Sequence, residues 1–168
     1  ILGILFKDEI ETTLSKTWIV GIMFIITGIC LLLVKNIKGN KDDYDITYKD
    51  AIMIGLIQGL ALFPGLSRSG MVLVGCLLCK LNREASLKYT FMLYFPVSAA
   101  TMILGVKDVI ETGLSSSLLL YYFVGMIFSF IFTYLFYKVL SNIVKKGKLY
   151  KFSIYLFIVG IFVLLYFI

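Results

Sequence analysis

The stretch that decides the fold is residues 51–79, AIMIGLIQGLALFPGLSRSGMVLVGCLLC, in which Arg68 is the one charged residue. As one straight helix this stretch would be about 43 Å long, well beyond the roughly 30 Å hydrocarbon thickness of a bilayer. Pro64-Gly65 interrupts it near its middle. Split there, residues 51–63 and 70–79 predict half-helices of about 20 and 15 Å, and neither is long enough to span a membrane. We therefore expect a re-entrant helix hairpin whose tip lies near the middle of the membrane.

The composition of the whole chain places this hairpin in a membrane protein. Hydrophobic residues make up 60% of the 168 residues and charged residues 15%, with a mean hydropathy of +0.98. A soluble globular protein has about 45–50% apolar and about 25% charged residues. Because the apolar runs do not alternate with polar residues, helices rather than a closed barrel are expected to satisfy the backbone in lipid. The composition excludes a soluble fold, a disulfide scaffold and a nucleic-acid-binding module.

Four further stretches are free of charge and long enough to cross a bilayer as helices of about 26–30 Å. They are residues 17–34, 89–106, 118–137 and 152–168. The fold class that we expect is an all-α membrane protein, a helical bundle forming a single transmembrane domain over residues 1–168. Since the sequence begins with an isoleucine and an apolar run rather than with methionine, we also expect it to start partway through a longer protein.

The distribution of charge predicts which loops share a side of the membrane. With a re-entrant hairpin, loops 35–50, 80–88 and 138–151 lie on one side and hold twelve Lys and Arg residues. Loops 7–16 and 107–117 lie on the other side and hold three. If the hairpin region spanned instead, the two sides would hold ten and five, a weaker bias. The positive-inside rule therefore favours the hairpin and places the twelve-cation side in the cytoplasm. The net charge of +6 is then an orientation signal.

The hairpin tip has the residue types of a phosphate-binding site. Ser67-Arg68-Ser69-Gly70 leads into the second half-helix, so unpaired backbone N–H groups and the positive end of a helix dipole are expected at the tip. The serine hydroxyls add donors, and the guanidinium can hold two phosphate oxygens at once. Gly65 and Gly70 would let the backbone approach a ligand closely.

Arg68 at this depth needs a compensating charge, since an arginine at the centre of a membrane helix costs about 2.5–3.5 kcal/mol. The nearest acidic residues in the sequence, Asp50 and Glu84, lie near the ends of the hairpin rather than at its tip. Structural alternatives remain open: Arg68 could extend towards the interface, and Ser67 and Ser69 could simply cap the half-helix. Gln58 is a further candidate, for either the ligand or a neighbouring helix.

Metal chemistry has little support within the chain. Cys76-x-x-Cys79 has a spacing found in metal and redox sites, but the chain has no histidine and only three cysteines. We therefore interpret these cysteines as buried apolar residues and expect no metal site in this chain.

The segment Gly55–Gly70, which contains Pro64-Gly65-Leu66-Ser67-Arg68-Ser69-Gly70, closely resembles the PGxSRSG signature of the undecaprenyl-diphosphate phosphatase family of the bacitracin-resistance type. Further matches are Leu5-Phe6-Lys7-Asp8 with Ile10-Glu11, Arg83-Glu84-Ala85, and Phe91 with Pro96. The resemblance implies an enzyme of the bacterial cytoplasmic membrane that hydrolyses a C55 isoprenoid diphosphate to the monophosphate and inorganic phosphate. Its product recycles the lipid carrier for cell-wall synthesis. It also implies a transporter-like fold of inverted repeats, each contributing a re-entrant helix pair.

The resemblance further implies what each part of the protein supplies. Arg68 is expected to be catalytic, and Gly65, Ser67, Arg68, Ser69 and Gly70 to bind the phosphates. The nucleophile, the base and a divalent cation such as Mg²⁺ or Ca²⁺ are expected from a preceding repeat, whose motif of glutamates, serine and histidine is absent here. This chain alone is therefore expected to be inactive. Val72 stands where the family usually has threonine, which removes one expected hydroxyl.

Two other functions remain open at this point, a flippase or anion transporter for phosphorylated lipids and a non-catalytic membrane subunit. A midplane anion site in inverted repeats is also what transporters use. An oligomer of identical chains is left open as well.

Overall fold

The computed structural model describes residues 16–112 and 116–167, and these fold entirely into helices and connecting turns. The helices are α3 (Thr17–Val34), α4 (Tyr48–Leu60), α5 (Arg68–Leu78), α6 (Arg83–Thr112), α7 (Ser116–Lys145) and α8 (Tyr150–Phe167), with a short 3-10 turn η1 (Asp43–Asp45). The described residues contain no strand, apart from an isolated bridge between Lys41 and Leu81. The predicted all-α fold class is confirmed. The matches at Leu5–Asp8 and Ile10-Glu11 lie outside the described residues.

Four of the described helices are long and apolar enough to cross a membrane. The candidate spans are Thr17–Val34, Arg83–Lys107, Leu120–Lys145 and Tyr150–Phe167. The first has the bounds predicted from the sequence. Helices α6 and α7, each of 30 residues, extend beyond the charge-free stretches 89–106 and 118–137 because the helix continues through lysines and serines at its ends. A charge-free stretch therefore predicts the part of the helix that is suited to lipid, but it underestimates the full length of α6 and α7.

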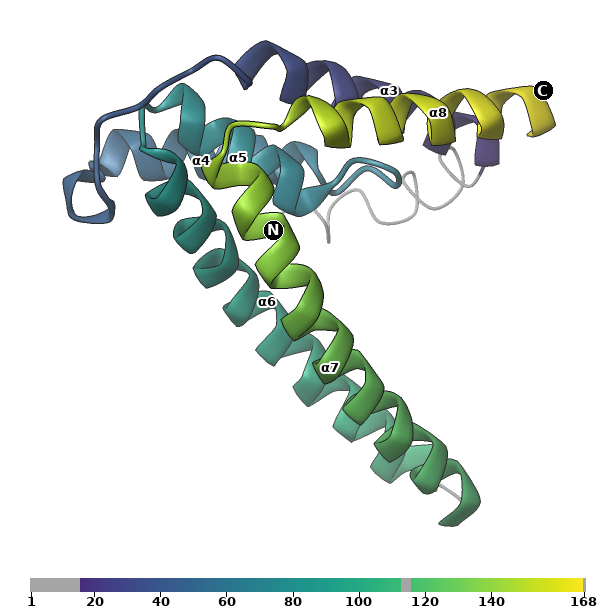
Figure 1. Cartoon of the computed structure of the whole chain (residues 1–168). Coiled ribbons are helices and arrows are strands. Elements are labelled where there is room, and N and C mark those ends of the chain that lie inside the picture. The colour runs from purple at the N-terminus through teal and green to yellow at the C-terminus, as the bar shows by residue number, and fades with distance from the viewer. Residues whose placement is uncertain (1–15, 113–115, 168) are drawn as a thin grey trace.

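Helices α3 and α8 lie side by side, and two glycines allow their backbones to meet (Figure 1). A Cβ added to Gly160 would lie 2.8 Å from the carbonyl oxygen of Gly21, and a Cβ added to Gly21 would lie 3.0 Å from the carbonyl oxygen of Gly160. Two helical turns further along α3, the ring of Phe157 occupies the space beside Gly28. Small residues at such a crossing let membrane helices approach closely. The hairpin packs against α3 of this pair.

Helices α4 and α5 form the short hairpin expected from residues 51–79, and they pack against each other. Helix α4 begins three residues before the predicted start because Thr47 and Asp50 form a capping box, each side chain accepting a hydrogen bond from the other residue's N–H. The turn between the helices contains Gly65, whose φ of +93° favours glycine. A Cβ there would lie 2.8 Å from the carbonyl oxygen of Val20, so the tip of the hairpin rests on the backbone of α3.

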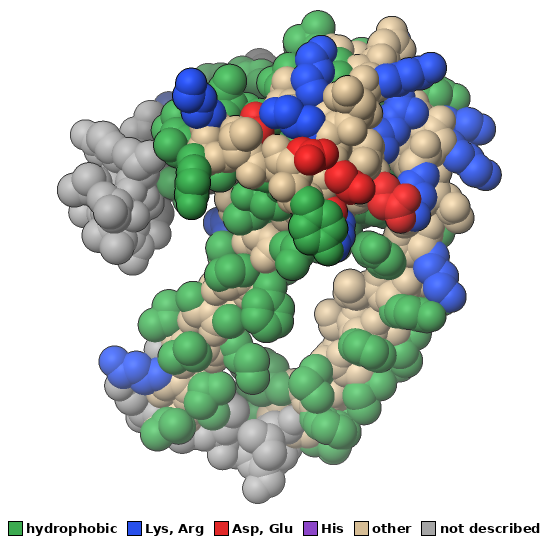
Figure 2. All heavy atoms as spheres, turned by 90° about the vertical axis from the view of Figure 1, so that its left-hand side faces the viewer, with side chains coloured by type: hydrophobic (Ala, Val, Ile, Leu, Met, Phe, Trp, Pro, Cys, Tyr) green, Lys and Arg blue, Asp and Glu red, His purple; other side chains and the backbone are tan. Residues whose placement is uncertain are grey.

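The loops predicted to share one side of the membrane meet in the structure. The bridge between Lys41 and Leu81 joins the first loop to the second, and Lys145 Nζ lies 2.8 Å from Glu84 Oε1, joining the third. Lys88 also forms an ion pair with Asp43. Figure 2 shows most of the charged side chains gathered at this end of the molecule, with mainly hydrophobic side chains covering the arms that project from it. Both ends of the hairpin therefore lie at the same end of the molecule, as a re-entrant element requires.

The core lies where the hairpin meets the long helices, at this same end. One cluster joins Leu31 and Val34 of α3 to Leu77 of α5, Val144 of α7 and Leu149. The remainder of α6 and α7 runs away from this core as a pair (Figure 1), with most of its large hydrophobic side chains exposed. This distribution suits a chain whose surroundings are lipid or further protein rather than water.

We predict that Gly160→Ala destabilises the chain, because the added methyl would force α3 and α8 apart. The expected loss is about 1–3 kcal/mol, the usual cost of overpacking a well-packed contact. The measurement is thermal unfolding of the full-length protein in detergent. Gly125→Ala on α7 is the matched control, since nothing lies within 4 Å of a Cβ at that position. Equal unfolding temperatures for the two variants would contradict this packing.

A second prediction concerns Asp50, whose pKa is held well below its usual value by hydrogen bonds from Lys41 and from Thr47. A carboxylate with a lowered pKa stabilises the fold above its unfolded pKa of about 3.9, and that stabilisation is lost as the pH falls below it. Asp50→Asn should therefore lower the unfolding temperature at pH 7, and the difference from wild type should shrink between about pH 4 and pH 2. Glu84→Gln is the control, because the Glu84 side chain is 73% exposed. A difference independent of pH would contradict the proposed cause.

Candidate anion site at the hairpin tip

Helix α5 begins at Arg68 with Ser67 as its N-cap. The Ser67 hydroxyl oxygen accepts a hydrogen bond from the Gly70 N–H at 3.2 Å, and the Ser67 carbonyl accepts one from the Met71 N–H at 2.8 Å. The capping alternative for Ser67 is therefore confirmed. It leaves the hydroxyl proton of Ser67 available to a ligand, since the cap uses only the oxygen as acceptor. Among the described residues, the N–H groups of Arg68 and Ser69 have no partner, as is usual at the start of a helix.

Thr27 fixes the depth of this helix start. Its side chain is fully buried, and its hydroxyl donates to the Met23 carbonyl at 3.0 Å and accepts from the Ser67 N–H at 3.4 Å. Along α3, Thr27 lies about 10 Å from the end at Val34 and about 15 Å from the end at Thr17. The start of α5 is therefore level with the middle part of a candidate membrane span. Sequence analysis did not identify Thr27, because a threonine in an apolar helix gives no sign of its partner forty residues away.

Arg68 is exposed on the surface of the described chain, and no acidic side chain pairs with it there. The described ion pairs join Lys41 to Asp50, Lys88 to Asp43 and Lys145 to Glu84, all at the charged end of the molecule. The expectation that Arg68 lacks a carboxylate partner therefore holds in the described part of the chain. The chain does not enclose the guanidinium, so its surroundings at this depth are lipid, further protein or a ligand.

The two glycines of the candidate site have packing roles in the structure. Gly65 forms the tip turn and lies against the backbone of Val20. A Cβ on Gly70 would lie 3.0 Å from the Ser67 Oγ and 3.4 Å from the Thr27 Cγ2. Both glycines thus hold the hairpin against α3. Their predicted contact with a ligand stays a prediction.

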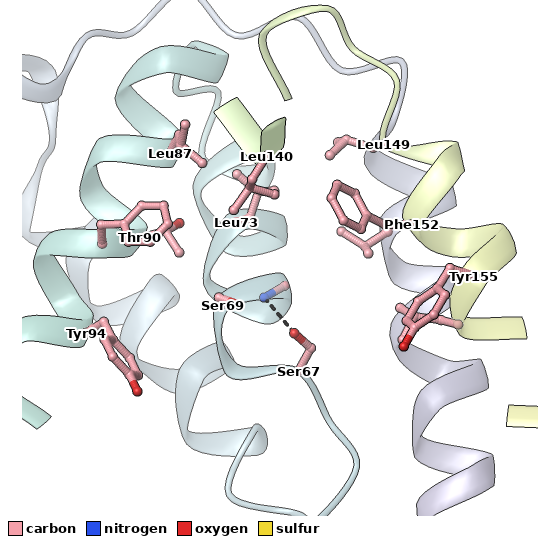
Figure 3. A pocket seen from close by; sticks show the side chains of 14 residues that line it. Ser67, Ser69, Leu73, Leu87, Thr90, Tyr94, Leu140, Leu149, Phe152 and Tyr155 are labelled. Carbon is pink, nitrogen blue, oxygen red and sulfur yellow. Dashed lines mark hydrogen bonds between the residues drawn. The ribbon is translucent and has the colours of Figure 1, made fainter. Parts of the chain in front are cut away.

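A cavity of about 520 Å³ opens beside the start of α5, between α6 and α8 (Figure 3). Ser67, Ser69 and Gly70 line one end of it, while Leu140 and Leu149 lie at the opposite end. The lining residues are Leu31, Ser67, Ser69, Gly70, Leu73, Leu87, Thr90, Phe91, Tyr94, Leu140, Leu149, Phe152, Tyr155 and Leu156. The walls are mostly apolar, and in Figure 3 the rings of Tyr94 and Tyr155 flank the end that carries Ser67. Sequence analysis did not find these tyrosines, because their neighbourhood depends on how α6 and α8 pack.

Four other predicted residues lie away from this cavity. Val72 is 2% exposed and packs with Ile54 and Cys76 between the hairpin and α6, so its side chain does not face the cavity. A threonine at this position would therefore not place its hydroxyl at the cavity in this structure. Cys76 and Cys79 are buried, as expected for apolar cysteines. Gln58 lies half-buried on α4 and does not line the cavity, and its binding role stays a prediction.

The described residues do not fit a bound metal ion. No group of three or more His, Cys, Asp or Glu side chains comes together within residues 16–112 and 116–167 in a way that could hold one. The expectation of a divalent cation held by a preceding part of the protein stays a prediction, and none of the steps described below passes through it.

Comparison with known proteins places this sequence in a family. A family model described as bacitracin resistance protein BacA matches residues 1–162. The chain is 40% identical over 166 residues to undecaprenyl-diphosphatase 2 of Bacillus thuringiensis and to undecaprenyl-diphosphatase 1 of Bacillus cereus. It is 37% identical over 162 residues to undecaprenyl-diphosphatase 1 of Halalkalibacterium halodurans. These matches cover 99%, 99% and 96% of this chain, but only 62%, 62% and 59% of the relatives. With bacterial relatives and four candidate spans, the chain is a multi-pass bacterial membrane protein.

We predict that Thr27→Val loosens the hairpin tip, because valine keeps the shape of threonine but cannot accept the Ser67 N–H. The expected loss of stability is about 1–3 kcal/mol, the cost of leaving a buried partner unsatisfied. Hydrogen exchange of residues 61–70 should become faster in this variant of the full-length protein, and Thr27→Ser should restore the wild-type rate. Thr101→Val is the control, since Thr101 is exposed and bonds only to its own helix. Unchanged exchange at the tip in Thr27→Val would show that Thr27 does not hold it.

Proposed function

The chain belongs to the bacitracin resistance protein BacA family, and from this we propose that it supplies the phosphate-binding part of an undecaprenyl-diphosphate phosphatase. The complete protein would hydrolyse undecaprenyl diphosphate to undecaprenyl phosphate and inorganic phosphate, in the membrane where the lipid carrier is recycled for the cell wall. Because the chain spans about 62% of the first relatives, the activity belongs to the longer protein. The present chain alone would be inactive.

The single observation that carries this proposal is the set of unpaired donors at the start of α5. The N–H groups of Arg68 and Ser69 and the hydroxyls of Ser67 and Ser69 lie where a helix dipole adds positive potential. The guanidinium of Arg68 adds a full positive charge, with no acidic partner in the described part of the chain. Such a set suits a diphosphate, which carries several negative oxygens.

The adjoining cavity favours a lipid diphosphate over a water-soluble one. Its apolar walls begin at the same Ser67 and Ser69 that we assign to the phosphates, and its volume of about 520 Å³ is in the range of ordinary ligand pockets. An isoprenoid chain has no polar groups to satisfy, so its first units could lie against Leu73, Phe91 and Leu156.

In the proposed reaction, the nucleophile expected from the preceding repeat would attack the terminal phosphorus while the anhydride P–O bond breaks, so that the lipid monophosphate leaves with its negative charge. Water would then take the phosphoryl group from that nucleophile and release it as inorganic phosphate. Ser67, Ser69 and the α5 N–H groups would hold the non-bridging oxygens in place. Arg68 would stabilise the charge that develops on the equatorial oxygens, and such positioning and electrostatic stabilisation are the main part of phosphoryl-transfer catalysis. The base that takes the proton from water is not among the described residues.

We predict that Arg68→Ala lowers phosphate release by the full-length protein by several orders of magnitude, because at least 10²–10³-fold is the usual effect of removing one strong stabilising donor. Arg68→Lys should recover only part of the rate, since an ammonium cannot make the paired contact of a guanidinium. The measurement is phosphate release from undecaprenyl diphosphate in detergent, with unfolding temperatures to show that each variant is folded. Near-normal turnover in Arg68→Ala would refute the catalytic role. Equal rates for lysine and arginine would refute bidentate binding.

The same assay separates hydrolysis from transport. Wild-type protein should release phosphate in detergent, where no transbilayer movement is possible. If the full-length protein in vesicles moved a lipid monophosphate across the bilayer and released no phosphate from the diphosphate, the proposed function would be wrong.

A further inference from the structure

Arg83, the first residue of α6, lies at a junction that the phosphatase chemistry does not use. Its Nη2 donates to the carbonyl oxygen of Lys35 at 3.0 Å, at the end of α3. On its other side the guanidinium lies against Gly147, where an added Cβ would overlap with Nη1. Its Nε is buried without a partner among the described residues. One side chain thus joins the end of α3 to the turn between α7 and α8.

Gly147 ends α7 in a way that leaves room for this contact. Its φ is +67°, its N–H donates to the Val144 carbonyl at 2.9 Å, and the Lys148 N–H donates to the Ile143 carbonyl at 2.9 Å. This is the Schellman pattern, in which a glycine in the left-handed region terminates the helix. A side chain at Gly147 would displace the guanidinium of Arg83, and the positive φ favours glycine in its own right.

The junction brings together lysines from two distant parts of the sequence. Lys35 and Lys38 follow α3, whereas Lys146 and Lys148 flank Gly147 and Lys151 lies in the first turn of α8. We call these five lysines the basic edge. None of them has an acidic partner in the described part of the chain. The nearby Glu84 forms an ion pair with Lys145 instead. The acidic residues of the preceding loop have other partners: Asp42 and Asp45 form the capping box of η1, Asp42 also accepts from Asn82, and Asp43 pairs with Lys88. The basic edge therefore has a local excess of positive charge.

The basic edge also lies at the level of a membrane surface. The candidate spans α3 and α7 end beside it, and α6 and α8 begin there. Clusters of four to eight Lys and Arg residues directly at the cytoplasmic ends of membrane helices attract anionic lipids. Lys38, Lys146, Lys148 and Lys151 are exposed, so their ammonium groups are free to reach a headgroup.

We propose that the basic edge is a binding site for the headgroup of an anionic phospholipid. Arg83 holds the end of α3 and the α7–α8 turn together, and the lysines on either side contact the lipid phosphate. Charge complementarity and the position at the ends of four candidate spans favour a phospholipid of the surrounding membrane over a soluble anion. The site is separate from the hairpin tip, since Arg68 lies a full α5 length from the loops that form this end.

The test is a titration of the full-length protein in neutral detergent with phosphatidylglycerol, with phosphatidylcholine or with inorganic phosphate, read as the unfolding temperature. Phosphatidylglycerol should raise it, and the other two should not. Lys146→Gln/Lys148→Gln should need about 25-fold more phosphatidylglycerol for half the effect, since each lysine near an anionic lipid contributes about fivefold. The control Lys49→Gln/Lys80→Gln removes the same charge from exposed positions elsewhere on the same predicted side.

Each of the other outcomes would overturn the proposal. An equal stabilisation by inorganic phosphate would show a simple anion site without lipid recognition. Equal weakening in the two double variants would show a diffuse attraction to net charge rather than a site at the basic edge. No response of the wild type to phosphatidylglycerol would show that no such site exists. Both double variants should unfold like wild type without lipid, which keeps a failure of binding distinct from a failure to fold.

Discussion

The hydrogen bond between Thr27 and Ser67 sets the depth at which α5 begins, and the chemistry of the hairpin tip depends on that depth. A helix start has free N–H groups wherever it lies, and in water those groups would be solvated. Here the Thr27 hydroxyl oxygen accepts a hydrogen bond from the Ser67 N–H, at a level about 10 Å along α3 from its end at Val34. Gly65 and Gly70 allow the hairpin to rest on α3 at this depth. Donors that would be ordinary at a surface thus lie where lipid offers them no partner, and a ligand with negative oxygens becomes the favourable one.

Much of this architecture could be predicted from the sequence because it depends on length and charge alone. The interruption at Pro64-Gly65 and the length of residues 51–79 exclude a single span, and the twelve cations on one side fix the direction of the hairpin. The structure then joins the three basic loops at one end through the Lys41–Leu81 bridge and the Lys145–Glu84 pair. The N-cap role of Ser67 was also predictable, since serine before an apolar helix is a common cap.

The parts that could not be predicted depend on which faces meet. Val72 faces the core between the hairpin and α6, although the family resemblance implies a hydroxyl near the phosphates at this position. Thr27 contacts Ser67, and Tyr94 and Tyr155 line the cavity, only because α3, α6 and α8 pack around α5. A single sequence carries no sign of such pairs. Local rules therefore predict the elements and the depth of the tip, while tertiary packing decides the walls of the cavity.

Arg68 and Arg83 show how position decides whether an arginine is structural or available to a ligand. Arg83 lies against the carbonyl of Lys35 and the end of α7, and helix C-termini carry partial negative charge that stabilises a cation. Arg68 lies at the N-terminus of α5, where the dipole adds positive potential to its own charge. No carboxylate in the described residues relieves that repulsion. The fold thus gives the Arg83 guanidinium a carbonyl partner from another helix, whereas the Arg68 guanidinium has no protein partner in the described residues. The same residue type therefore joins helices at one end of the molecule and is suited to bind phosphate at the hairpin tip.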